Sequence, residues 1–542
     1  MFCHTPRENL RNMRPFTILA MLVAAGCTHT PHVEAPAPPA NVEARLAAAD
    51  QLVRLGCFDC LTDALREYDG IRAMPNVGVD DTVAATVGGF RAMVLLDLRE
   101  RELGMTDDGY FGKARNRLAA GMPGGGAAEA NDVARAFQAL LDAVDTIPWR
   151  VGRPRSSDAD VAALRQATAL RANLPRLTDE RRAPADQDEL SAYVWLAFSC
   201  THGTGPSSTR NELESVLPRF HTAPIIAYRN ATCRGANAGA LADLLEREPR
   251  FAEVHYLLGM SAIGAREVEK AEAMLRKAYE WRRRWPAVTL ALANVFMTLE
   301  EFEPALEFYE GTLSLVPGYG EASIGRVRAL SLLFRHADAF TAIDAMVNAP
   351  ARVLPGEAYY WRAWNDVAVE KIEDGWSDIQ QAERLWMNAN VSKLAGVIAY
   401  RRHELGVARV KFEEARRLNP EDCETQYDLG NVLAEQSQWS ATLDTFTVAA
   451  TCLEGARETL RQEVRRIEVS TMTSERKARQ IANREEKITA ATRMLAQSWF
   501  NSAAASFNLS RKPEARQFAE KLLDDEQFGA RARDLIATLG KD

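Results

Sequence analysis

The chain has 542 residues, of which 47% are hydrophobic, and a formal net charge of −8 at pH 7. Apolar residues recur at helical spacing through most of the sequence and strand-type alternation is scarce, so we expect an all-α protein. The acidic balance argues against binding to nucleic acid and against broad adhesion to anionic lipid.

The first residues predict export. Three arginines, at positions 7, 11 and 14, precede an apolar run from Phe16 to Ala25 that is too short to span a bilayer. The run ends in small residues directly before Cys27. Residues 1–26 are therefore expected to be a secretion signal peptide.

The end of this segment resembles the lipobox of exported bacterial lipoproteins, in which the cysteine is acylated and becomes the mature N-terminus. The resemblance implies lipidation at Cys27 and, because Thr28 rather than an aspartate follows, a place at the periplasmic face of the outer membrane. The alternative is an ordinary cleaved signal and a soluble periplasmic protein. Residues 27–42 are rich in proline and alanine, which predicts an extended tether.

Residues 43–217 predict helices without a regular period. The segments 46–55 and 59–71, joined at Gly56, look like one degenerate helix pair, and joints rich in glycine and proline separate the helices that follow. We interpret this region as a divergent array of helical hairpins. Its further helices are expected over residues 81–103, 112–120, 130–145, 159–170 and 188–198.

A period of 34 residues begins near residue 218. Ala271, Ala305 and Ala339 are 34 residues apart, and the same frame returns one residue late at Ala408. A small residue followed by an apolar residue four positions on, and later by a proline, describes a helix that packs tightly and then stops. In the unit from 218, Asn237 stands where the small residue belongs and Pro224 falls within the first helix pattern. Units start near 218, 252, 286, 320, 356, 389 and 423.

This pattern resembles the tetratricopeptide repeat, a unit of 34 residues that forms two antiparallel helices. The first half of the unit matches as well, for example at Leu258 with Gly259 and at Leu429 with Gly430. The resemblance implies a right-handed superhelical solenoid of helix pairs over residues 218–455. It also implies a binding scaffold without enzymatic activity, whose partner is a protein or peptide.

In this family the first helix of each unit lines a concave groove. No unit here combines the lysine and asparagine with which chaperone-binding relatives grip a C-terminal carboxylate, so that mode of binding is not expected. Tyr360 and Trp364 are four residues apart and share the groove face, with Arg328 and Arg401 in adjoining units, which predicts a binding hot spot. The implied groove residues are Tyr256, Asn294, Arg328, Tyr360, Trp364, Tyr400, Arg401, Tyr427 and Asn431.

Six cysteines remain after the signal peptide and Cys27, an even number that suits an oxidising compartment. Cys423 begins the first helix of its unit and Cys452 closes the second, so antiparallel packing brings them together. Cys200 and Cys233 lie near helix ends that must splay together for a disulfide to form.

Cys57 and Cys60 form a CxxC pair at a helix start. A local disulfide is favoured over a redox pair or half of a metal site, because no second CxxC and no preceding strand accompany it. The sequence contains no phosphate loop, no GxSxG elbow, no HExxH and no dinucleotide fingerprint. We therefore expect no catalytic residue, no metal and no cofactor.

Residues 456–509 interrupt the array. Apolar residues at Leu460, Val464 and Ile467, and a second run that continues to about Asn508, predict two helices joined by a short polar turn. We expect a coiled-coil-like helical hairpin that projects from the solenoid. Its dense charges are expected to be solvated, with a docking arm as the alternative. Residues 510–542 are expected to supply the last repeat helix and a capping helix.

Two functions are consistent with these features. The first is a lipid-anchored scaffold at the cell envelope that binds a protein or peptide partner through the concave groove during assembly of an envelope complex. The alternative is an accessory protein or cryptic enzyme acting on cell-wall or surface polysaccharide, for which an aromatic groove could hold sugar rings.

Overall fold

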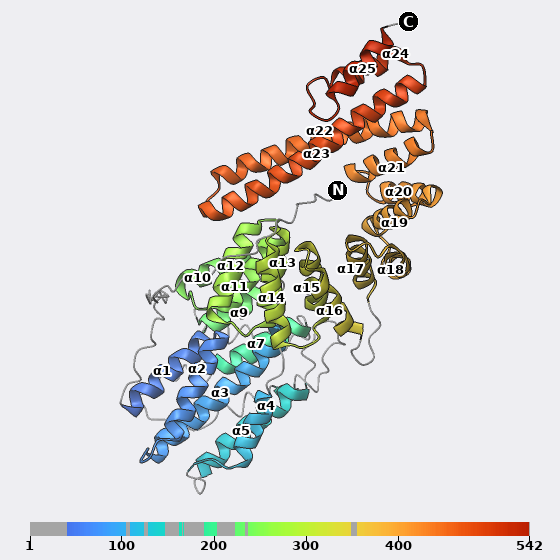
Figure 1. Cartoon of the computed structure of the whole chain (residues 1–542). Coiled ribbons are helices and arrows are strands. Elements are labelled where there is room, and N and C mark those ends of the chain that lie inside the picture. Colours follow the sequence, from blue (N-terminus) through green and yellow to red (C-terminus); the bar gives the residue numbers. More distant parts are fainter. Residues whose placement is uncertain are drawn as a thin grey trace, which may run out of the picture.

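The computed structural model shows a helical protein in which the regular structure of the described part is α-helix (Figure 1). The predicted signal peptide, Cys27 and most of the helix predicted over 159–170 lie outside the described residues. No helix in the described ranges has the length and apolar character needed to cross a membrane. The structure describes residues 41–103, 109–123, 128–146, 162–164, 166, 189–202, 220, 223–233, 237–347 and 355–540.

The N-terminal helices pack around one hydrophobic core that includes Tyr68, Phe90 and Trp195. Gly56 adopts a left-handed conformation (φ 70°) that ends the first helix, and a Cβ atom at this position would lie 2.3 Å from the Ile225 side chain. Only glycine therefore fits this joint. The helices are α1 (Val42–Leu55), α2 (Phe58–Arg72), α3 (Val79–Leu103), α4 (Tyr110–Ala119), α5 (Ala128–Thr146) and α7 (Glu189–His202).

The repeat array consists of antiparallel helix pairs. The unit predicted from 218 begins later than expected, because Pro224 is the first residue of its helix rather than an interior one. Proline lacks an N–H group and suits the first helical turn. Asn237 accepts a hydrogen bond from the Ala240 N–H and caps the next helix. This pair is α9 (Pro224–Thr232) and α10 (Ala238–Arg247).

The following units begin at the predicted residues. Their first helices start at positions 252, 286, 320, 356, 389 and 423. The pairs are α11 (Ala252–Gly264) and α12 (Val268–Trp281), α13 (Pro286–Thr298) and α14 (Phe302–Leu315), α15 (Gly320–Leu332) and α16 (His336–Val347), α17 (Gly356–Ala368) and α18 (Ile372–Leu385), α19 (Ala389–Arg401) and α20 (Leu405–Leu418), and α21 (Cys423–Glu435) with α22 (Trp439–Val469).

A left-handed residue recurs at each turn between the two helices of a pair. Arg266 has φ 61°, and the N–H groups of Arg266 and Glu267 reach back to the carbonyls of Ile263 and Ala262. This is the hydrogen-bond pattern that ends a helix with a Schellman motif. The same conformation follows at Glu300, Phe334, Glu370, His403 and Ser437, spaced as the predicted units are.

The last pair of the array is extended into a long hairpin. Helix α22 runs without a break through the boundary predicted at 455/456, and α23 (Ser474–Asn508) continues directly into the last repeat. Helices α24 (Lys512–Glu520) and α25 (Gly529–Leu539) close the chain. The expectation that the charges of the hairpin are solvated is wrong for Arg476 and Arg484, whose side chains are paired and mostly buried. The far end of the hairpin lies against the turns of α12 to α14, where oppositely charged side chains meet (Figure 1).

Candidate functional site: the inner face of the repeat array

The first helices of the repeats form the inner face of a curved array. Each first helix from α11 to α21 contacts the second helix of its own pair and also the first helix of the next pair. Figure 1 shows the pairs following a curved path from α11 to α21. The predicted groove would be lined by this side of the first helices.

A cleft of about 960 Å³ opens beside α15. Its apolar wall includes Leu313, Ile324 and Met346, and Glu321 and Arg328 supply charge. Its volume is within the range of ligand pockets in proteins. The remaining lining residues are Pro317, Gly318, Gly320, Ser323, Arg326, Ala342, Ala345, Pro355 and Glu357.

A chain of hydrogen bonds leads across three helices to this cleft. Arg328 of α15 bonds the hydroxyl of Tyr309, which donates to the Asn294 amide oxygen at 2.6 Å. The Asn294 amide then donates to Glu321 at 3.0 Å. Burial raises the pKa of Tyr309, although Arg328 opposes the shift, so the phenol stays protonated and can donate. The network joins two predicted groove residues, Asn294 and Arg328, of which Arg328 lines the cleft.

Arg328 carries a positive charge without an ion pair in the described part of the chain. Arg326, in contrast, pairs with Glu310 at 3.2 Å. Among the described residues, the carboxylates of Glu321 and Glu357 accept only from neutral groups, the Asn294 amide and the Trp361 indole, so they keep their negative charges at the cleft. A ligand carboxylate could therefore pair with Arg328 beside an apolar wall, but it would also meet the negative charges of Glu321 and Glu357.

The predicted hot spot lies one repeat further on and is packed more tightly than expected. Tyr360 is half-buried and its ring contacts Trp386, with centroids 5.9 Å apart. Trp364, also half-buried, contacts Phe334 (6.2 Å) and His336 (5.9 Å). These contacts tie both residues to neighbouring turns, so their role in binding stays a prediction.

Arg401 is engaged at the turn after α17. It donates to Glu370 at 3.2 Å and to the carbonyl oxygen of Val367 at 3.3 Å. Its charge is therefore not free to flank Tyr360 and Trp364, as the sequence suggested.

The other predicted groove residues are half-buried and have partners within the chain. Tyr256 packs on Trp285 with ring centroids 4.8 Å apart. Tyr400 donates to Glu435, and Tyr427 bonds Asn431. Asn431 also accepts from Asn501 of α23 at 3.3 Å, so the hairpin helix covers this end of the groove.

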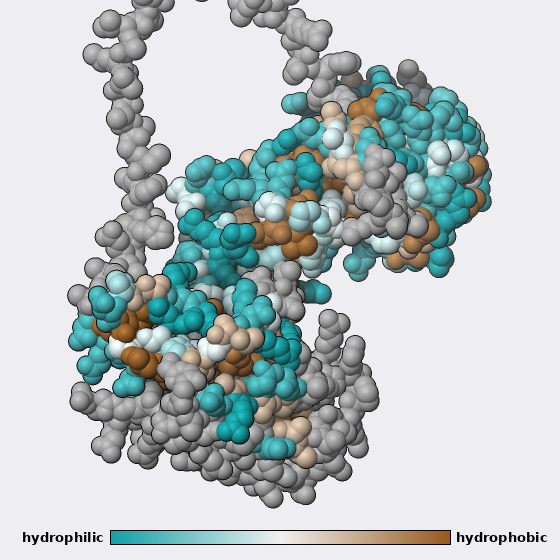
Figure 2. Space-filling model, turned by 90° about the horizontal axis from the view of Figure 1, so that it is seen from below, coloured by the Kyte–Doolittle hydropathy of each residue, from teal (hydrophilic) through white to brown (hydrophobic). Residues whose placement is uncertain are grey.

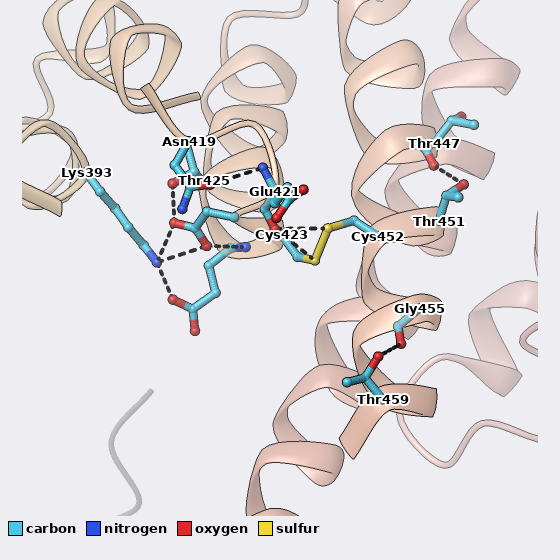
Figure 3. The surroundings of a disulfide bond; sticks show 12 residues. Lys393, Asn419, Glu421, Cys423, Thr425, Thr447, Thr451, Cys452, Gly455 and Thr459 are labelled. Carbon is cyan, nitrogen blue, oxygen red and sulfur yellow. Dashed lines mark hydrogen bonds and ion pairs between the residues drawn. A yellow bond between two sulfur atoms is a disulfide. The ribbon is translucent and has the colours of Figure 1, made fainter. Parts of the chain in front are cut away.

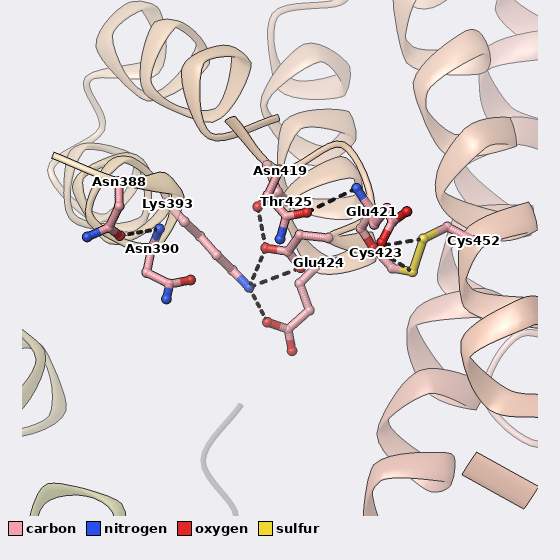
Figure 4. Close-up of polar contacts among 10 residues, drawn as sticks. Asn388, Asn390, Lys393, Asn419, Glu421, Cys423, Glu424, Thr425 and Cys452 are labelled. Carbon is pink, nitrogen blue, oxygen red and sulfur yellow. Dashed lines mark hydrogen bonds and ion pairs between the residues drawn. A yellow bond between two sulfur atoms is a disulfide. The ribbon is translucent and has the colours of Figure 1, made fainter. Parts of the chain in front are cut away.

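Lys393 occupies the fifth position of its unit but is engaged by carboxylates of the next one (Figures 3 and 4). Its ammonium group pairs with Asp422 at 3.1 Å and with Glu424. Burial opposes ionisation of Asp422, yet the hydrogen bond from Thr425 and the charge of Lys393 lower its pKa. Asp422 thus caps α21 as an anion.

The structure contains the three predicted disulfides. Cys423 and Cys452 join the start of α21 to α22, with Cα atoms 5.5 Å apart (Figure 3). The Cα atoms of Cys200 and Cys233 are 4.9 Å apart, so the helix ends do splay together.

Cys57 and Cys60 are joined at a Cα distance of 5.0 Å, and each is about 1% exposed. Burial of both sulfur atoms denies access to a thiol partner, which favours the structural interpretation over redox exchange. No group of three potential metal ligands is present in the described residues.

The cleft beside α15 was missed at the sequence level because its wall combines residues of first and second helices. Ala342 and Met346 come from α16, and second helices are expected to face away from the groove. One signal was available: the unit from 320 is 36 residues long instead of 34, which separates α16 from α17.

Three of the pairs, α11/α12, α19/α20 and α21/α22, also share one close contact. A Cβ atom on Gly259, Gly396 or Gly430 would lie 2.8 Å from Leu275, Phe412 or Phe446 of the second helix. With the period of about 34 residues, this small-to-large contact defines the repeat. The fold is a tetratricopeptide-repeat solenoid.

Comparison with known proteins adds partial structural likeness. No protein-family model and no curated protein sequence matches the chain. MamA from Desulfovibrio magneticus RS-1 is 19% identical over 32% of this chain and 96% of its own, with a TM-score of 0.28. PilF of Pseudomonas aeruginosa is 13% identical, over 54% and 99%, with a TM-score of 0.28. The Cut9–Hcn1 hetero-tetramer of the APC/C is 12% identical, over 92% and 96%, with a TM-score of 0.38. Likeness of this size carries no information on the partner.

Figure 2 shows one face of the molecule, on which hydrophobic patches are separated by hydrophilic surface. A surface of this kind suits recognition by a few anchor residues rather than by one broad apolar area.

Proposed function

We propose that this protein is a lipid-anchored scaffold at the periplasmic face of the outer membrane that binds a protein or peptide partner during assembly of an envelope complex. The observation that carries the binding role is the cleft beside α15, where Arg328 lacks an ion pair beside an apolar wall. An extended peptide with an apolar side chain and a nearby carboxylate matches both parts of this cleft.

The aromatic residues of the fifth unit favour a peptide over a polysaccharide. Tyr360, Trp361, Trp364 and Trp386 contact one another edge to face, with centroids between 5.1 and 6.0 Å. Rings that pack together in this way leave less free face for a sugar. We therefore propose a binding scaffold without catalytic activity.

Site-specific photocrosslinking tests the binding role. A photoreactive phenylalanine at Ser323, which lines the cleft, is expected to give one discrete protein adduct in intact cells. The control places the photoreactive phenylalanine at Thr341, an exposed position of α16 outside the cleft, and is expected to give no protein adduct. Arg328→Ala should abolish the Ser323 adduct. Equal labelling from both positions, or an adduct that survives Arg328→Ala, would contradict the cleft assignment.

Membrane attachment is tested separately. Cys27→Ser should release the protein into the soluble periplasm. The substitution removes the residue that is acylated and leaves the sequence that directs export unchanged. Unchanged partition into the membrane fraction would refute the lipid anchor and leave the crosslinking result unaffected.

A further inference from the structure

The hairpin formed by α22 and α23 returns to a distant part of its own array. Arg476, at the start of α23, donates to Glu272 of α12 at 2.6 Å and to Glu301 at 2.5 Å. Gln480 adds a bond to Glu301 at 3.4 Å. These partners are 175 to 204 residues apart in the sequence.

A second set of contacts lies one turn further along α23. Arg484 donates to Glu300 at 2.8 Å and to Glu463 of α22 at 2.6 Å, and Lys487 donates to Glu300 at 2.6 Å. Glu300 is the left-handed residue at the turn between α13 and α14. We call the contacts of Arg476, Arg484 and Lys487 with Glu272, Glu300 and Glu301 the clasp.

The clasp is partly withdrawn from water. The side chains of Arg476, Glu301 and Glu272 are 16%, 12% and 7% exposed. Burial alone would raise the pKa of Glu300, but the hydrogen bond and charge of Lys487 lower it, so the carboxylate stays charged. Isolated ion pairs on a surface contribute little to stability. Removing one partner from a network withdrawn from water leaves a buried charge without an opposite charge beside it, which is costly.

The other end of the hairpin is fixed to α21. The Cys423–Cys452 disulfide holds α22 at its root, and Asn501 of α23 bonds Asn431 of α21. Both hairpin helices are unbroken between root and tip. The hairpin is thus a stiff bar attached near α21 at one end and near α12 to α14 at the other, as Figure 1 shows.

In the described residues of α15 to α20, the long-range hydrogen bonds and ion pairs join neighbouring repeats, as Asn365 with Ser331 and Arg401 with Glu370 do. In a solenoid each repeat contacts its neighbours, and small rotations between neighbours add up along the array. Curvature over several repeats is therefore a soft property unless a contact between distant repeats fixes it.

We propose that the hairpin is an intramolecular strut that fixes the curvature of the array from α12 to α21, and with it the width of the concave face. Release of the clasp lets the array extend while each repeat keeps its own fold. The proposal concerns the protein alone and does not depend on the identity of a partner.

Two measurements on one pair of variants test the strut. Spin labels on Thr471→Cys at the hairpin tip and Ser314→Cys in α14, both exposed positions, report the separation across the clasp by pulsed electron resonance. Small-angle X-ray scattering reports the extension of the whole molecule. Native disulfides stay oxidised throughout.

The variant Glu300→Lys with Glu301→Lys reverses two clasp charges. The matched control is Glu269→Lys with Glu307→Lys, which changes the same total charge at exposed positions of α12 and α14 outside the clasp. We expect the clasp variant to lose the wild-type label distance and to increase in radius of gyration, and the control to retain wild-type values of both.

A wild-type label distance that persists in the clasp variant would overturn the clasp. Loss of that distance with an unchanged radius of gyration would show that the hairpin moves without controlling curvature, and would overturn the strut. If the charge-reversed variant loses helicity, Arg476→Gln with Arg484→Gln removes the ion pairs of these two arginines with Glu272, Glu300 and Glu301 without introducing repulsion. The label distance and the radius of gyration of this variant then test the strut in the same way.

Discussion

Gly430 of α21 faces the ring of Phe446 in α22 so closely that a methyl group on its Cα would lie 2.8 Å from two ring carbons. Gly430→Ala should lower the free energy of unfolding by about 1–2 kcal/mol, because overpacking in a filled core outweighs the gain in helix propensity. Urea denaturation measures the change.

Gly311 in the middle of α14 provides the control, since nothing lies within 4 Å of a Cβ atom built there. Gly311→Ala should stabilise the protein by up to about 1 kcal/mol. A Gly430→Ala variant as stable as the wild type would mean that the two helices can separate without cost, against the packing described.

Glu253 joins the N-terminal helices to the repeat array from a fully buried position. It accepts hydrogen bonds from Arg99 of α3 and from the Phe58 backbone N–H of α2, each at 2.7 Å. Glu253→Ala removes the nearer carboxylate of the buried Arg99 guanidinium, leaving Glu102 at 3.9 Å, and should destabilise the protein by about 3–5 kcal/mol.

Glu280→Ala is the matched change at an exposed ion pair, in which Lys277 is the partner at 2.9 Å. It should cost less than about 1 kcal/mol. Thermal unfolding of both variants gives the comparison. Equal losses of stability would show that burial does not strengthen the contribution of the Arg99–Glu253 pair.

The Cys423–Cys452 disulfide closes a loop with a sequence separation of 29 residues. Replacing both cysteines with alanine should reduce stability by about 3–4 kcal/mol by the loop-entropy argument. Thr451→Ala, a change at an exposed neighbour, should leave stability nearly unchanged. Free thiols at both positions after alkylation of protein isolated without reductant would rule the bond out.

Asp366 of α17 gives stability a defined pH dependence. It is 4% exposed, and burial together with the negative charges of Asp378 and Asp374 raises its pKa to about 7. Between about pH 4 and 7 the folded state keeps a proton that the unfolded state has lost, so stability falls as pH rises through this window.

Asp366→Asn removes this titration. The variant should be more stable than the wild type at pH 8, by on the order of 2 kcal/mol, and similar to it near pH 4. Denaturation midpoints at the two pH values measure the difference. Parallel pH profiles for the two proteins would show that Asp366 ionises without cost in the folded state.

The repeat frame was predictable because it is local. Each unit places its small residue and its helix-ending signal within about 34 residues, and the structure confirms an all-α solenoid whose first helices start where the pattern starts. The left-handed residues at the turns were not predicted, since Phe334 and His403 carry no composition signal for that conformation.

The clasp could not be predicted from the sequence. Arg476 and Glu272 are 204 residues apart, and a charge run has the same composition whether its side chains meet solvent or each other. Which glutamate meets which arginine depends on the summed curvature of the repeats between them. The cleft beside α15 was missed for a related reason, because Arg328 could be placed on its helix face but Met346 could not be placed opposite it.

The three disulfides pair cysteines in the order in which they occur along the chain. Cys57 bonds the next cysteine, Cys200 bonds Cys233, and Cys423 bonds Cys452, so no loop crosses or encloses another. When the chain is exported N-terminus first, both cysteines of one native pair are exposed before those of the next pair. Oxidation in order of emergence therefore gives the native connectivity, without a later step of disulfide isomerisation.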